Sequence, residues 1–191
     1  MARERKFSTD DLFKTTKQLL LQQGYEGFNF SLLADRLEVS RGALYKYYEN
    51  KEQLITDFMI YEMEQFLLEL KEMDKHKDFD SQFDFLMNLI FNNTEIMQLI
   101  KVAQHILLNS NEKGKENKEK LEKLPLELYK YLQSFIDVGK ANGKLKHHIP
   151  DSLMLGFIFQ SVAIPNHYGI SQSEWVCSIK EIISKGMFTN E

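Results

Sequence analysis

Apolar residues recur at helical spacing along most of the chain, and this pattern predicts a series of amphipathic helices. The spacing places them at about 9–23, 30–37, 41–47, 51–70, 79–92, 95–108, 126–141, 152–164 and 172–185. The sequence therefore predicts an all-α fold of about nine helices. Three short N-terminal helices are joined by a long helix to a C-terminal helical bundle.

Capping residues mark where the first helices begin and end. Ser8, Asn29, Ser40 and Asn50 each precede one of the first four helices, and short polar side chains of this kind accept hydrogen bonds from free backbone N–H groups. Gly24 can take the left-handed conformation that ends the first helix. The N-terminal boundaries are therefore the best defined in the chain.

Residues 109–123 form a mixed-charge stretch that is almost free of apolar side chains. The pair Glu116 and Lys120 could support a solvated helix, but the stretch offers no core. We expect a mobile connection here.

Composition favours a cytoplasmic protein. The single cysteine, Cys177, has no partner for an intramolecular disulfide, and the N-terminus lacks the apolar run of a signal peptide. The longest apolar stretch, 153–164, contains polar residues and is too short to cross a bilayer. We expect no membrane association, and we expect Cys177 to be a small buried apolar residue, with a redox-sensing thiol as the alternative.

Charge is unevenly distributed along the chain. The net charge of −4 argues against a protein that coats nucleic acid indiscriminately. Residues 1–51 nevertheless contain nine basic and seven acidic side chains, so this segment is net positive and the remainder is strongly negative. An N-terminal segment that meets a polyanion fits this distribution.

The segment 33–45 has the apolar spacing that packs two short helices across a tight turn. Ala34 is small where the second helix crosses, Val39 fills the turn, and Leu44 anchors the second helix from inside. The outward-facing positions are Arg41, Ala43, Lys46 and Tyr47. This is the pattern of a DNA-binding helix-turn-helix, although a helical hairpin with an ordinary solvated face has the same apolar spacing.

Residues 40–54 read SRGALYKYYENKEQL, which resembles the signature of the TetR (tetracycline repressor) family of bacterial transcriptional regulators. The detailed resemblance covers about 7–58, and the rest fits in length, helical character and the GKANG stretch at 139–143. Glu38 stands where the family turn usually has Gly, and Tyr48 where it usually has Phe. A left-handed Glu38 would cost on the order of 1 kcal/mol, and Tyr48 needs an outlet for its hydroxyl.

The resemblance implies a helix-turn-helix DNA-binding domain at 1–50 and a ligand-binding and dimerisation domain at 51–191. Candidate DNA-binding residues are Asn29, Ser31, Ser40, Arg41, Gly42, Ala43, Tyr45, Lys46, Tyr47 and Lys51. Arginine offers a bidentate fork to guanine, whereas tyrosine hydroxyls and lysines bind phosphate without identifying the base. Lys51 lies at the positive end of the long helix, where a phosphate would be attracted. Plain capping explains Asn29 equally well.

A dimer follows from the same resemblance, because one helix-turn-helix contacts too little DNA for strong specificity. The helix at 152–164 is apolar almost all round, and the last helix carries a second apolar stripe. Candidate interface residues are Leu153, Phe157, Ile158, Trp175, Ile179, Ile182 and Ile183. The alternative is that both helices are core helices of a monomer.

Ligand sensing is likewise implied by the resemblance. Candidate pocket residues are Met97, Ile100, His105, Phe135, Met154 and Phe157, a set suited to an apolar or amphipathic effector. Such a stripe is also what an ordinary core contains. His147 and His148 have no carboxylate or thiol at ligand spacing, so we expect no metal and no cofactor.

The resemblance thus implies three partners: a palindromic double-stranded DNA operator, a second copy of the chain, and a small-molecule effector that releases a repressor from DNA. A small helical enzyme is the first alternative, but the chain shows no nucleophile–base pair, Glu-x-x-His pattern or glycine-rich phosphate loop. The second alternative is a helical protein–protein adaptor without DNA binding. An adaptor function would not explain why Arg41, Tyr45 and Lys46 share one surface.

Overall fold

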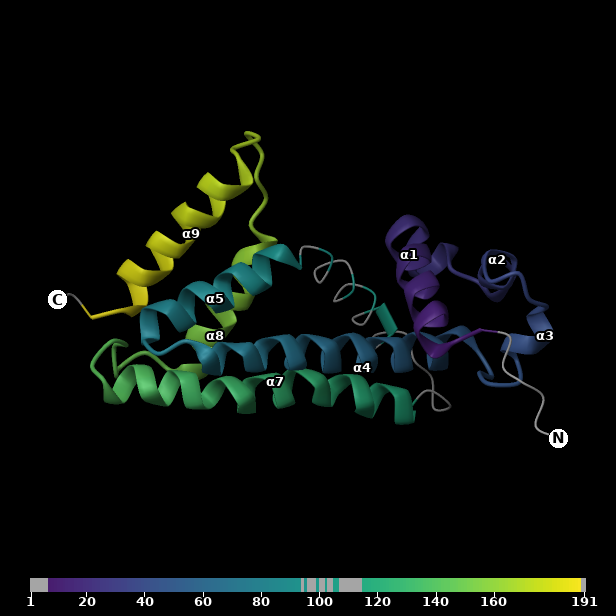
Figure 1. Cartoon of the computed structure of the whole chain (residues 1–191), viewed down its shortest axis with the longest axis horizontal. Helices are drawn as coiled ribbons and strands as arrows, with labels where there is room; N and C mark the ends of the chain where they lie inside the picture. The colour runs from purple at the N-terminus through teal and green to yellow at the C-terminus, as the bar shows by residue number, and fades with distance from the viewer. Residues whose placement is uncertain are drawn as a thin grey trace. The chain divides into compact units, whose positions relative to one another are not determined.

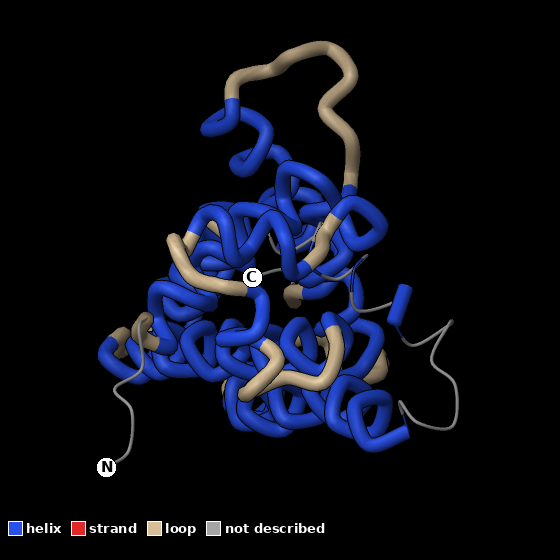
Figure 2. The backbone as a smooth tube through the Cα atoms, turned by 90° about the vertical axis from the view of Figure 1, so that its right-hand side faces the viewer, coloured by secondary structure: helices blue, strands red, loops and turns tan. Residues whose placement is uncertain are grey.

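The computed structural model describes residues 7–93, 95, 99, 102, 105–106 and 115–189, and in this part of the chain the regular elements are helices (Figure 1; Figure 2). The α-helices are α1 (Thr9–Gly27), α2 (Phe30–Arg36), α3 (Arg41–Leu44), α4 (Lys51–Leu70), α5 (Phe79–Asn92), α7 (Lys115–Ala141), α8 (Asp151–Gln160) and α9 (Gln172–Met187). Two short 3₁₀ helices, η1 (Lys71–Lys75) and η3 (Ser161–Ala163), follow α4 and α8. The all-α prediction is confirmed.

The chain divides into two compact units. The first unit contains residues 1–64 and 98–124, and the second contains 65–97 and 125–191. Helices α4 and α7 each contribute one part to each unit.

Local hydrogen bonds define the first helix as the sequence predicted. The Ser8 hydroxyl oxygen accepts from the backbone N–H of Asp11 (3.0 Å), and the Asp11 carboxylate accepts in return from the backbone N–H of Ser8 (3.3 Å). Gly24 is left-handed, with φ 65°, and interrupts the helix where the sequence predicted its end. One further turn then carries α1 to Gly27.

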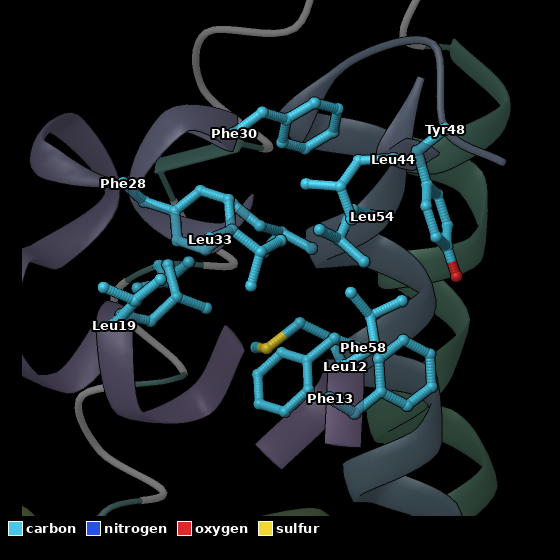
Figure 3. Close-up of a cluster of buried hydrophobic side chains, with 14 of the residues drawn as sticks. Leu12, Phe13, Leu19, Phe28, Phe30, Leu33, Leu44, Tyr48, Leu54 and Phe58 are labelled. Carbon is cyan, nitrogen blue, oxygen red and sulfur yellow. The ribbon is translucent and has the colours of Figure 1, made fainter. Parts of the chain in front are cut away.

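The core of the first unit lies where α1, α2, α3 and the first part of α4 converge (Figure 3). Leu33, Leu44, Leu54 and Phe58 are fully buried there, and each contributes about 1.5–3 kcal/mol relative to an exposed position. Asn50 begins α4 by accepting from the backbone N–H of Gln53 through its side-chain oxygen (2.8 Å). The short helices are therefore held by long-range burial as well as by their caps.

In the second unit, α9 packs against α5 and α8. Phe79 of α5 stacks on Phe135 of α7, with ring centroids 4.6 Å apart. Gly139 lies so close that a Cβ atom there would come within 2.5 Å of the Phe79 ring and 2.7 Å of the Leu145 side chain. Glycine at this position is therefore required by close packing of α7.

The prediction of a mobile connection at 109–123 is wrong for residues 115–123, which are the first turns of α7. Leu121 is buried in the core of the first unit, and Glu116 pairs with Lys120 at 2.9 Å. The burial of Leu121 and the Glu116–Lys120 ion pair support a helix here, although the charge-rich composition of the stretch predicted no packed structure. The predicted helix at 95–108 lies mostly outside the described residues. Within this range, residues 99, 102, 105 and 106 are described as helical.

Candidate nucleic-acid interface

The turn between α2 and α3 is closed by a left-handed residue. After α2 ends at Arg36, the backbone N–H of Glu38 donates to the carbonyl of Asp35 (3.2 Å), and that of Val39 donates to the carbonyl of Ala34 (2.9 Å). Glu38 has φ 54°, so the turn has the geometry that usually selects glycine. The conformation costs on the order of 1 kcal/mol with a non-glycine residue, and the burial around it offsets that cost.

Helix α3 is shorter than predicted, because it ends at Leu44 and not at Tyr47. The N–H of Tyr47 donates to the Leu44 carbonyl three residues back (2.9 Å), which tightens the last turn beyond α-helical geometry. Leu44 is fully buried and holds α3 against the core. One face of residues 40–47, called the α3 segment from here on, is therefore fixed by Leu44, and the opposite face points outward.

Most of the predicted DNA-contacting residues lie on that outward face. Ser40, Arg41, Gly42, Tyr45, Lys46 and Tyr47 are exposed, and Ala43 is half-buried. Ser40 begins α3, although its side chain makes no capping hydrogen bond. Among the described residues, no carboxylate or carbonyl is paired with Arg41 or Lys46 through its side chain. Both cations are therefore available to an external anion.

Tyr45 and Tyr47, which precede and follow Lys46 in the sequence, each pack against a phenylalanine. Tyr45 meets Phe30 edge to face at 5.0 Å between ring centroids, and Tyr47 meets Phe7 at 5.9 Å. Tyr45 remains 50% exposed and Tyr47 43% exposed. The arrangement places amphipathic rings in fixed positions on a polar surface.

Lys51 lies differently from its neighbours. Its ammonium donates to the backbone carbonyls of Tyr25 (2.9 Å) and Phe28 (3.4 Å), and lies 4.2 Å from the centroid of the Tyr25 ring. The same tyrosine donates to a Glu52 carboxylate oxygen (3.2 Å), and burial together with that carboxylate raises the pKa of Tyr25. The geometry thus connects Lys51 to the end of α1. Tyr25 was missing from the sequence candidates, because a contact between residues 26 positions apart leaves no local pattern.

The two remaining candidates lie at the start of α2. The Asn29 side-chain oxygen accepts from the backbone N–H groups of Ser31 (3.0 Å) and Leu32 (3.1 Å), which is the capping role. Ser31 is half-buried. A phosphate contact by either residue stays a prediction.

The candidate pocket residues are dispersed. Met97 and Ile100 lie outside the described residues. In the second unit, Phe135 and Met154 are buried, whereas Phe157 is 61% exposed. Their role in binding a ligand stays a prediction.

His105 lies in the first unit, beside an open hollow of about 450 Å³. Its imidazole Nε2 is 3.0 Å from a Glu26 carboxylate oxygen, and its ring lies 4.4 Å from that of Tyr25. Leu20 and Val102 line the apolar side of the hollow. His105 therefore contacts Glu26 and Tyr25 at the edge of this open hollow.

The candidate dimer residues divide into two sets. Ile158, Ile179 and Ile183 are buried within the second unit, and Trp175 is half-buried. Leu153, Phe157 and Ile182 are 50%, 61% and 71% exposed. The second set therefore leaves large apolar side chains exposed on α8 and α9, and a dimer interface there stays a prediction.

Three further observations bear on function. Cys177 is exposed on α9, so the expectation of a buried cysteine is wrong. Within the described residues, histidine, cysteine, aspartate and glutamate side chains form no group of three that could hold a metal ion. Nor is any described helix long and apolar enough to span a bilayer.

Residues 12–57 match the family model described as bacterial regulatory proteins, tetR family. These residues include α2, the turn, α3 and the start of α4. The sequence matches no curated protein.

Solved structures resemble the whole chain. A ketosteroid transcriptional regulator from Mycobacterium tuberculosis is 13% identical with a TM-score of 0.71, and the match covers 100% of this chain and 98% of that one. A putative regulator from Saccharomonospora viridis in complex with choline is 12% identical with a TM-score of 0.80, covering 95% and 97%. The regulator FadR from Bacillus subtilis, in complex with stearoyl-CoA, is 19% identical with a TM-score of 0.74, covering 94% and 99%. At these identities the likeness establishes the fold.

Proposed function

We propose that the chain, whose residues 12–57 match the model of bacterial regulatory proteins of the tetR family, represses transcription by binding a palindromic operator as a homodimer, and that a small-molecule effector releases it from DNA. The observation that carries the proposal is the outward face of the α3 segment. Arg41 and Lys46 are exposed there, whereas Leu44 is buried, and Tyr45 and Tyr47, the sequence neighbours of Lys46, are each braced by a phenylalanine. A protein segment that recognises DNA sequence, here called the reading element and formed by the α3 segment, needs a rigid inner face and an exposed polar outer face.

The outward residues divide by chemistry. Arg41 can donate two parallel hydrogen bonds to a guanine edge, so it is proposed to read sequence. Lys46, Tyr45 and Tyr47 are proposed to hold phosphates near it, with Gly42 and Ala43 allowing close approach of the backbone. Gly42 supports this role, because a Cβ atom there would meet nothing closer than 4.0 Å and the position is open to an external surface.

Dimerisation is proposed through α8 and α9. Leu153, Phe157 and Ile182 are large apolar side chains that remain at least half exposed, and burial by a second copy would remove that area from water. Two reading elements one helical turn apart would then match a palindromic site. The adaptor alternative gains no comparable support.

The effector is proposed to act through a two-state change. Helix α4 begins next to the reading element and ends in the second unit, so a shift in α4 would alter the spacing of the two heads in a dimer. By reciprocity, the effector and DNA must weaken each other by the same factor, typically about 5- to 150-fold. Two of the structural neighbours are in complex with choline and with stearoyl-CoA, and the second of these makes amphipathic acyl compounds the first class to screen.

The test is binding of the purified protein to its own upstream promoter DNA and to a scrambled duplex, together with its mass in solution. We expect a dimer that prefers the promoter and loses affinity steeply with salt. Arg41→Ala should narrow the preference for promoter over scrambled DNA, whereas the distant exposed control Lys130→Ala should leave it unchanged. A monomer that binds both duplexes equally would favour the adaptor function.

A further inference from the structure

The loop between α8 and α9 carries the most exposed aromatic side chain among the described residues. Tyr168 is 94% exposed, and Ile164 and Ile170, which lie near it in the sequence, are 48% and 37% exposed. The loop follows η3 and leads into the start of α9 (Figure 1). Tyr168 therefore adds little to the packing of its own subunit, and its ring is available to a partner.

Two hydrogen bonds close this loop. The Asn166 side-chain amide donates to the Ile170 carbonyl (2.6 Å), and the backbone N–H of Ile170 donates to the Asn166 side-chain oxygen (3.0 Å). Gly169 is left-handed, with φ 65°, which fits the sharp turn between them. Tyr168 is thus presented on a closed turn, so less conformational entropy is lost when a partner covers it.

Charged side chains are almost absent from this part of the chain. Residues 151–179 contain neither lysine nor arginine, and their only acids are Asp151 and Glu174. A surface without cations does not attract the phosphates of DNA. Depletion of charged residues together with exposed aromatic side chains is instead typical of the centre of a protein–protein interface. The chemistry of the loop therefore indicates another protein surface as its partner.

Gly156 on α8 is an independent sign of a close approach. A glycine within a helix is destabilising relative to alanine. Packing within the subunit does not require it, because a Cβ atom there would meet nothing within 4 Å in the described part of the chain. Leu153 and Phe157, its neighbours on α8, are 50% and 61% exposed. An open glycine beside exposed apolar side chains leaves room for a partner to come near the helix backbone.

The size of a stable dimer interface argues for a second copy of the chain as the occupant. Such interfaces bury about 800 Å² per subunit. A fully exposed aromatic side chain offers on the order of 150–250 Å², and the exposed residues Leu153, Phe157 and Ile182 are only 50%, 61% and 71% exposed, so they provide well under that area. The loop joins the two helices that carry these residues and adds three further apolar side chains. In a two-fold dimer each loop contact is also made twice.

From these observations we propose that the loop 164–171 is part of the homodimer interface, with the Tyr168 ring of each subunit buried against the α8 and α9 surface of the other. The proposal rests on the proposed homodimer and adds a second contact to it. Gly156 marks the place on α8 where the partner approaches most closely.

The experiment measures the dimer Kd of the full chain by sedimentation over a series of protein concentrations. Tyr168→Ala should raise the Kd about 30-fold or more, as expected when a central aromatic residue of an interface is truncated. Tyr168→Phe keeps the ring and should change the Kd by no more than about fivefold, the contribution of one hydrogen bond. Leu126→Ala is the matched control, because Leu126 is a 58% exposed apolar residue on α7, outside the proposed interface, and it should leave the Kd unchanged.

Gly156→Leu separates an external contact from an internal one. Leucine is a better helix former than glycine, and its Cβ atom would meet open space within the subunit, so the helix content measured by circular dichroism should be retained. The same change should raise the dimer Kd about tenfold or more, because the added side chain occupies the space of the partner. A Kd that stays the same would show that no partner approaches Gly156.

A crosslinking measurement tests the position of the loop directly. With Tyr168 replaced by the photoreactive residue p-benzoylphenylalanine, illumination of the purified protein should join two copies, and the same replacement at Leu126 should not. A dimer that gives no crosslink at position 168 and keeps its Kd in Tyr168→Ala would overturn the loop contact while leaving the homodimer in place. If the unmodified protein is a monomer at every concentration, the proposed homodimer fails, and the loop contact fails with it.

Discussion

The exposed aromatic and aliphatic side chains of the α3 segment differ from those of α8 and α9 in the groups at their ends. Tyr45 and Tyr47 carry hydroxyl groups, and each ring is braced by a phenylalanine behind it. Leu153, Phe157 and Ile182 end in hydrocarbon. In the proposed function both surfaces meet a partner, and the polar end of the side chain is what suits the α3 segment to phosphates and bases and α8 and α9 to another protein surface.

The two surfaces also differ in how their inner faces are fixed. Leu44 is wholly buried on the inner side of a four-residue helix, and every outward position follows from that single anchor. Helix α8 is apolar on nearly all sides, so its buried residues, Met154, Leu155 and Ile158, give little guidance about the outer face. The comparison can be tested by changing one inner and one outer residue at a time.

The largest effect is expected from the inner anchor of the reading element. Leu44→Ala should lower the free energy of unfolding by about 2–5 kcal/mol, because it removes buried methyl groups and leaves a cavity. Leu32→Ala, at a 38% exposed position on the neighbouring helix, is the matched control and should cost much less. Urea unfolding followed by circular dichroism measures both, and equal losses would mean that Leu44 does not anchor the segment.

A smaller effect is expected at the outer face of α8. Phe157→Glu should weaken self-association by about 2 kcal/mol or more, roughly a 30-fold rise in the dimer Kd, because a charge would replace the most exposed apolar residue of the helix. Sedimentation at a series of protein concentrations gives the Kd. Ser152→Glu places the same charge at another exposed position of α8 and should change it less. An unaltered mass for Phe157→Glu would move the dimer surface elsewhere.

Sequence patterns predicted the starts of the first helices closely because the capping groups at Ser8, Asn29 and Asn50 act within a few residues of the helices they begin. The apolar spacing of Leu33 and Leu44 is also visible in the sequence, although their burial depends on long-range packing and α3 ends three residues earlier than predicted. The contacts of Lys51 could not be predicted, because they depend on where α1 and α4 meet. The first turns of α7 were missed for the same reason, since one long-range contact by Leu121 decides them.

Lys51 and Lys46 provide a finer comparison within the first unit. Lys46→Gln should reduce the salt slope of DNA binding by about 0.9, the value for one released phosphate contact. Lys51→Gln should leave the slope unchanged and instead lower stability by about 1–2 kcal/mol, because two half-buried carbonyls lose a charged donor. Anisotropy titrations over a salt series separate the two effects. A slope reduced equally by both changes would instead support the phosphate contact that the sequence predicts for Lys51.

The smallest expected effect is a pH dependence in the second unit. The Lys140 ammonium (2.5 Å) and the Gln133 amide (2.7 Å) donate to the Asp151 carboxylate and hold the pKa of Asp151 below its usual value of 3.8. The stabilisation is therefore present above about pH 4 and is lost as the pH falls through the lowered pKa.

Because Asp151 is about one-third exposed, we expect this contribution to be below about 1 kcal/mol. Asp151→Asn should flatten thermal stability between pH 5 and 3 relative to the unmodified protein. Asp35→Asn, whose carboxylate has no hydrogen-bond partner in the described part of the chain, is the control. If thermal stability depended on pH in the same way for all three proteins, the predicted contribution of the Lys140–Asp151 pair would be contradicted.

Pro125 gives α7 a discontinuity in hydrogen exchange. Proline has no amide proton, so the carbonyl of Leu121 lacks its usual i+4 donor, and the missing bond falls where the chain passes from the first unit to the second. Amide protons of residues 115–124 should therefore exchange with solvent at the rate at which the first unit opens. Those of residues 126–141 should exchange at the rate at which the second unit opens. A helix that is continuous in geometry can thus belong to two separate cooperative units.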